Sequence, residues 1–80
     1  MFTISNCLHR TLELPKSSLK DKQKQVYIIE ILSNITLYYQ EKVTHHKPYD
    51  IILFNQSTTL RVESLDQTPL LLRVHHAIFD

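Results

Sequence analysis

Apolar and polar residues alternate along the first part of the chain, from Phe2 to Leu14. A period of two is typical of a half-buried strand. The apolar positions share one face: Phe2, Ile4, Leu8, Leu12 and Leu14. The polar positions and the single cysteine share the other: Thr3, Ser5, Cys7, His9, Thr11 and Glu13. Because thirteen residues is long for one strand, we expect a bend near Asn6 or Arg10.

The pattern becomes helical after Pro15. Ser17 and Ser18 are good N-cap residues, and Asp21 follows Ser18 by three positions, as in a capping box. Apolar residues then recur every three or four positions: Ile28, Ile31, Leu32, Ile35, Tyr39 and Val43. This spacing predicts one long amphipathic helix, to about residue 43, whose apolar stripe covers a sheet. Pro48 stops any continuation.

Three strands are predicted after Pro48, at residues 49–55, 58–64 and 70–79. The first has a continuous apolar centre from Ile51 to Phe54, which suits a strand covered on both faces or one beside a dimer contact. In the second, Leu60 and Val62 point inward. In the third, two faces alternate: Leu70, Leu72, Val74, His76 and Ile78 on one, and Leu71, Arg73, His75, Ala77 and Phe79 on the other.

These elements predict an α+β fold of order β-α-β-β-β, in which residues 1–80 form a single domain. The strand-helix-strand unit favours a parallel pair, and short turns favour an antiparallel meander of the last three strands. The result is a four-stranded mixed sheet with one long helix packed on one face. Because one helix covers only one face, the other face of the sheet is left open to a partner.

Composition narrows the class of protein. Nine basic and eight acidic residues give a net charge of +1, so global charge gives no support for a nucleic-acid or membrane-surface protein. One cysteine, Cys7, excludes an internal disulfide framework. The first residues lack the features of a signal peptide, and no apolar run approaches the ~18 residues of a membrane span. We therefore expect an intracellular, cytoplasmic protein with no membrane contact.

The chain contains no glycine. This absence removes the phosphate-binding loop, the dinucleotide fingerprint and the nucleophile elbow, all of which need glycine. It also implies that turns with positive φ fall on Asn or Asp, or are avoided.

The preferred functional hypothesis is a small, non-enzymatic interaction or regulatory module. It acts through the open sheet face, as a homodimer or with another protein partner, and needs no cofactor. The residues expected at the contact are apolar or tyrosine side chains: Leu71, Ala77, Phe79, Tyr38 and Tyr49. Tyrosine suits interfaces because it combines a large apolar body with a polar tip.

A basic cluster supports an alternative hypothesis, the binding of a nucleic acid or a phosphate. The cluster comprises Lys16, Lys20, Lys22 and Lys24, with one acidic residue, Asp21, among them. It surrounds the predicted start of the helix, where free N–H groups and the helix dipole favour anions.

The C-terminal residues carry a third alternative. His75-His76-x-x-x-Asp80 follows an apolar strand and resembles the active-site motif of the chloramphenicol acetyltransferase and peptide-synthetase condensation superfamily. That resemblance covers about thirteen of the eighty residues and implies a fragment or relic of an acyltransferase. It would make His76 the general base and Asp80 a structural carboxylate. No metal site is predicted, because Cys7, His9 and His75 lack zinc-type spacing.

Overall fold

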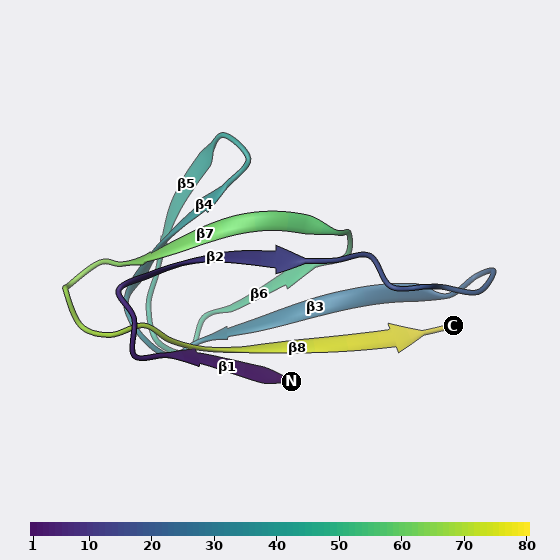
Figure 1. The fold of residues 1–80 in the computed structure, drawn as a ribbon, viewed down its shortest axis with the longest axis horizontal. Coiled ribbons are helices and arrows are strands. Elements are labelled where there is room, and N and C mark those ends of the chain that lie inside the picture. Colours follow the sequence, from purple (N-terminus) through teal and green to yellow (C-terminus); the bar gives the residue numbers. More distant parts are fainter.

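Eight β-strands make up the fold, and no segment is helical (Figure 1). The structure is a computed structural model that describes all 80 residues. The strands are β1 (Phe2–Ser5), β2 (His9–Leu14), β3 (Lys24–Ile31), β4 (Ile35–Tyr39), β5 (Lys42–His46), β6 (Ile51–Phe54), β7 (Thr58–Ser64) and β8 (Leu71–Phe79). No helix that could span a membrane is present.

The strands form two antiparallel sheets of four. Sheet A has the order β1-β8-β3-β6, and sheet B has the order β2-β7-β4-β5. The first strand pairs with the last, the second with the second-last, and so on inward to the β4–β5 hairpin. Two further pairings, β3 with β8 and β4 with β7, complete the sheets. This is the connectivity of a double-sheet jelly roll, an antiparallel ribbon wound into two layers.

The predicted helix is wrong, and with it the α+β fold class. Residues 24–46 form the three strands β3, β4 and β5 instead. In β3 the side chains of Gln25, Tyr27, Ile29 and Ile31 are buried at a strict period of two. The segment is rich in β-branched and aromatic residues, which lose rotamer freedom in a helix and pack well on a pleated sheet. The spacing of three and four arose because three strands follow one another at short intervals.

The predicted sheet arrangement is also wrong. Every strand pair is antiparallel, so the mixed sheet does not exist. The last three strands do not form a meander, since β6 and β8 lie in sheet A and β7 in sheet B. The single strand expected over residues 2–14 is two strands in different sheets. The expected bend does occur at Asn6, which has a φ of 61°.

The core lies between the inner faces of the two sheets. Fourteen buried apolar side chains form one cluster: Ile4, Leu12, Leu14, Tyr27, Ile29, Ile31, Ile35, Leu37, Phe54, Leu60, Val62, Leu70, Leu72 and Val74. The ring of Phe54 on β6 packs edge-on against Tyr39 on β4, with 4.9 Å between centroids, and links the two layers. The inward positions predicted for Leu60 and Val62 are confirmed. On the face predicted to be shared by residues 70, 72, 74, 76 and 78, the first three are buried, whereas His76 and Ile78 are exposed, as are Phe2 and Leu8.

The expectation that turns with positive φ fall on Asn or Asp, or are avoided, is wrong. Besides Asn6, the left-handed region is occupied by Lys22, Gln40, Tyr49 and Gln67. Gln40 is the first of the two residues that close the β4–β5 hairpin. A two-residue hairpin loop needs positive φ at this position to match the twist of its strands, and glycine is the usual choice. The chain therefore accepts local strain at several turns.

Candidate functional site

The outer surface of sheet A is predominantly apolar, and we call it face A. Its apolar side chains come from three adjacent strands, β3, β6 and β8: Val26, Ile28, Ile51, Leu53, Leu71, Ala77 and Phe79. The register makes them neighbours, because Ile28 is paired with Leu53, and Val26 with Ala77. Paired residues project from the same side of a sheet. Ile51 and Leu53 are 64% and 62% exposed, more than Leu71 and Phe79 on the same face.

A charged group lies within face A. Glu30 on β3 is paired with Ile51 on one side and with Arg73 on the other. Its carboxylate accepts a hydrogen bond from Nε2 of His75 and lies 4.0 Å from the guanidinium of Arg73. Face A thus combines apolar side chains with one negative side chain, Glu30, and two positive ones: Arg73, adjacent to Glu30 in register, and Lys24, paired with Phe79.

The structure separates the predicted partner-binding residues. Leu71, Ala77 and Phe79 are exposed on face A, as the sequence suggested. Tyr38 lies on the opposite sheet, and Tyr49 lies in the connection before β6 with 86% of its surface exposed. The sequence alone does not place Ile51 and Leu53 on this surface, because their unbroken apolar run suits either a strand covered on both faces or one beside a dimer contact.

The outer surface of sheet B, which we call face B, is polar. The residues that project from this face are His9, Thr11, Glu13, Thr36, Tyr38, Thr59, Arg61 and Glu63, with Val43 and His45 from the edge strand β5. Arg61 makes a salt bridge to Glu63 at 2.6 Å and lies over the ring of Tyr38 at 5.8 Å. Thr36 is hydrogen-bonded to His45 at 3.1 Å. Four of the polar side chains of face B are thus paired with one another.

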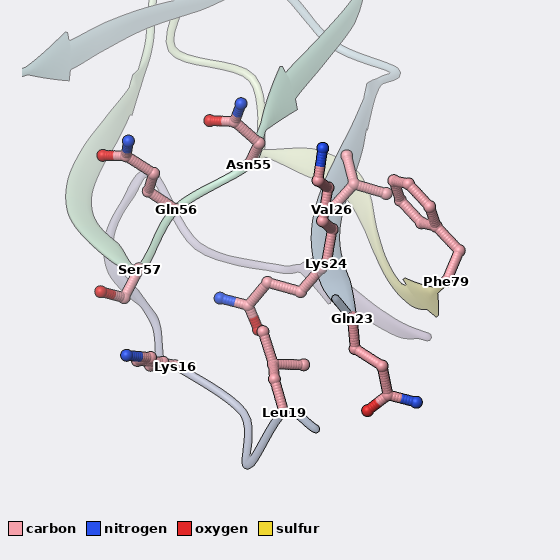
Figure 2. A pocket seen from close by; sticks show the side chains of 10 residues that line it. Lys16, Leu19, Gln23, Lys24, Val26, Asn55, Gln56, Ser57 and Phe79 are labelled. Atoms are coloured by element: carbon pink, nitrogen blue, oxygen red, sulfur yellow. The ribbon is translucent and has the colours of Figure 1, made fainter. Parts of the chain in front are cut away.

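A pocket of about 590 Å³ opens at one end of the sandwich, where β3 extends beyond the end of β6; we call it the end pocket. Figure 2 shows Asn55, Gln56 and Ser57 of the β6–β7 turn on one side, and residues of β3 across from them. Lys16 and Leu19 of the β2–β3 connection lie at its lower edge in this view. The complete lining is Lys16, Leu19, Gln23, Lys24, Gln25, Val26, Asn55, Gln56, Ser57 and Phe79.

Hydrogen bonds hold the β2–β3 connection against sheet A beside this pocket. The hydroxyl of Tyr27 donates to the carbonyl oxygen of Pro15, and the backbone N–H of Ser17 donates to Oε1 of Gln25 at 3.1 Å. His76 stacks on Tyr27 with 4.4 Å between ring centroids, and its Nε2 lies 3.2 Å from the same Oε1. Lys16, which lies between the two anchored residues, is thereby placed at the rim of the pocket.

His76 takes part in the same hydrogen-bond network through its Nε2 atom. Because the N–H of Ser17 donates to Oε1 of Gln25, that atom is the amide oxygen, and Nε2 of His76 must donate to it as an N–H. Ser17 Oγ lies 3.1 Å from the same nitrogen. No hydrogen bond or ion pair joins Asp80 to His76, the two residues that the acyltransferase resemblance singles out.

The predicted anion-binding lysines are divided between the pocket and the surface. Lys16 and Lys24 line the end pocket, whereas Lys20 and Lys22 lie in an exposed turn that is closed by a hydrogen bond from Gln23 N to Lys20 O. The helix start that was expected to attract anions does not exist. The structure contains no group of three or more His, Cys, Asp or Glu side chains arranged to hold a metal ion.

At the opposite end of the sandwich, Asp66 organises the β7–β8 connection (Figure 1). Hydrogen bonds from the Thr68 hydroxyl, the Asn34 amide and the Thr68 backbone lower the pKa of Asp66 from 3.8 to about 2. The Ser64 hydroxyl donates to the same carboxylate. This group fixes the chain where it crosses from sheet B to sheet A.

No protein-family model, curated protein or solved structure matches the chain. Face A and the end pocket are the two regions on which the functional proposals below are based.

Proposed function

We propose that the protein is a non-enzymatic interaction or regulatory module that forms a homodimer through face A. The observation that carries this proposal is the concentration of exposed apolar side chains on one of the two outer faces. An antiparallel sheet with one solvated face normally alternates apolar and polar residues, as sheet B does. Large exposed apolar patches on small domains mark interaction surfaces.

A second copy of the chain is the partner that the charges of face A favour. An isologous interface must be complementary to itself, because each patch meets the same patch. Glu30 and Arg73 are adjacent in register, so a two-fold axis near them would bring Glu30 of one copy to Arg73 of the other. A face of one charge sign would repel its copy, whereas this one supplies both signs.

Size supports the same partner. A domain of this length has a small core, and association is one of the ways in which small domains gain buried apolar area.

Sedimentation velocity on matched variants tests the proposal. Leu53→Lys and Val43→Lys each place a charge at an exposed apolar position, 62% and 56% exposed respectively, on face A and face B. We expect wild type and Val43→Lys to sediment as dimers at micromolar concentration and Leu53→Lys to sediment as a monomer with an unchanged circular dichroism spectrum. A monomeric wild type, or a dimer disrupted only by Val43→Lys, would refute the proposal.

Ala77→Lys separates face-to-face docking from pairing of edge strands. β8 is internal to sheet A, between β1 and β3, so its exposed side chain matters only if the face itself is covered. Loss of the dimer in Ala77→Lys supports face-to-face docking. Retention of the dimer in Ala77→Lys would show that the copies associate elsewhere.

A further inference from the structure

We infer that the end pocket binds a small phosphorylated molecule with a hydroxyl-rich body, of the sugar phosphate class. This proposal does not rest on the proposed dimer, although the pocket adjoins face A and shares Val26 and Phe79 with it. Its lining contains the two lysines Lys16 and Lys24 and no Asp or Glu side chain. The local charge is therefore positive, although the chain as a whole is almost neutral, and an anion is the ligand it attracts.

Gln25 provides a fixed donor at the wall of the pocket. Gln25 is only 5% exposed. Its Oε1 accepts hydrogen bonds from the Ser17 N–H and from Nε2 of His76. Its Nε2 has no hydrogen-bond partner within the protein. Because every fully buried side-chain nitrogen and oxygen atom in the protein has such a partner, Nε2 is not fully buried, and we infer that it faces the open space of the pocket. An amide N–H₂ can only donate, which suits a phosphate oxygen.

The turn across the pocket supplies groups for hydroxyls. Asn55, Gln56 and Ser57 are exposed there, and their side chains make no hydrogen bonds within the protein. Amides and hydroxyls both donate and accept, as recognition of a sugar hydroxyl requires. Leu19, Val26 and Phe79 supply the apolar part of the lining.

The volume and the rigidity of the pocket fit a ligand of this class. Its volume of about 590 Å³ lies within the ~300–1,000 Å³ typical of small-molecule sites. The hydrogen bonds that anchor Pro15 and Ser17 to sheet A hold Lys16 near the rim before a ligand arrives. Preorganisation of this kind reduces the cost of binding.

Amide NMR titration of the full chain with glucose 6-phosphate tests the inference, with glucose and inorganic phosphate as matched probes. We expect chemical-shift changes centred on Gln25, Lys24 and Ser57, binding by glucose 6-phosphate tighter than by phosphate, and none by glucose. Lys16→Ala and Lys24→Ala should each weaken binding roughly tenfold, since a hydrogen bond to a charged group is worth about 1.5–3 kcal/mol. Lys42→Ala, on the distant β4–β5 hairpin, should leave binding unchanged.

Three outcomes would overturn the inference: no shifts with millimolar glucose 6-phosphate, equal weakening by Lys42→Ala, or binding no tighter than that of inorganic phosphate. Binding of a single-stranded oligonucleotide that depends on Lys20 and Lys22 rather than on Lys16 would assign the basic segment to nucleic acid instead. Sedimentation of the same variants keeps this test separate from the dimer, because loss of ligand binding with an intact dimer concerns the pocket alone.

Discussion

Face A and face B are the outer surfaces of two sheets of equal strand number, yet their chemistry is opposite. On face B, Arg61 pairs with Glu63 and covers Tyr38, and threonines occupy much of the remainder. On face A, Ile51 and Leu53 are mostly exposed with no protein group over them. Both sheets bury their inner faces in the same core. The proposed dimer through face A would account for the difference between the outer faces.

The inner faces of the two sheets should contribute comparably to stability, although the outer faces differ. Ile29 of sheet A and Val62 of sheet B are each at most 1% exposed. We expect Ile29→Ala to reduce the free energy of unfolding by ~2–5 kcal/mol and Val62→Ala by somewhat less, because valine loses fewer methyl groups. Urea denaturation measures both. A large loss for one sheet and none for the other would contradict a shared core.

A charge exchange on face A should reveal self-recognition. Glu30→Lys places a second cation beside Arg73. We expect this variant to weaken the dimer by about tenfold or more, since like charges at an interface cost several kcal/mol. Combining Glu30→Lys with Arg73→Glu restores one charge of each sign and should recover most of the affinity. If the double variant remains as weak as the single one, Glu30 does not face Arg73 across the interface.

A glycine in the β4–β5 hairpin, which projects from sheet B (Figure 1), should stabilise the fold without any effect on the dimer. Gln40 has a φ of 55°, which costs a residue with a Cβ atom about 1–2 kcal/mol. We expect Gln40→Gly to raise the free energy of unfolding by about 1 kcal/mol, part of the relief being offset by the greater freedom of glycine in the unfolded chain. Thermal denaturation measures the change, and a destabilised variant would contradict it.

Polar contacts on face B should matter little. The Arg61 side chain is 56% exposed, and a cation over an aromatic ring at an exposed site contributes about 0.5–1 kcal/mol. We expect Arg61→Ala to lower the free energy of unfolding by no more than this amount and to leave the dimer intact. Weakened dimerisation in Arg61→Ala would place face B at the interface.

The smallest predicted effect on stability comes from Asp66 in the β7–β8 connection, which joins the two sheets. NMR titration of the Asp66 carboxyl carbon should give a pKa near 2 instead of 3.8. Because the folded-state pKa is depressed, the ionised carboxylate stabilises the fold above pH 3.8, and this contribution is lost as the pH falls through about 2. The stability difference between wild type and Asp66→Asn should therefore disappear over that interval. An ordinary pKa would show that Thr68 and Asn34 do not hold the carboxylate.

The strands after Pro48 could be predicted from the sequence because their alternation is local. β7 begins and ends where the pattern places it, and β8 differs by one residue. The segment from Lys24 to His46 misled because spacings of three and four also arise when consecutive short strands each contribute apolar residues. Its β-branched residues favour strands, and giving them more weight than periodicity would have pointed to the correct structure.

The candidate site was only partly accessible from sequence. Leu71, Ala77 and Phe79 could be assigned to one face because strand alternation fixes it. The neighbours that complete face A, Ile51 and Leu53, depend on β6 pairing with β3, a long-range choice that no local pattern encodes. The end pocket likewise joins segments near residues 16, 25 and 56, so Gln25 gave no signal of its own.

Isotope-filtered NMR on a mixture of labelled and unlabelled protein tests the homodimer most directly. If face A is the interface, intermolecular NOEs will connect the methyl groups of Ile28, Leu53 and Ala77 with those of the second copy. Val43 on face B will show none. Intermolecular NOEs confined to Val43, or the absence of any at concentrations where the protein is fully associated, would contradict a dimer formed through face A.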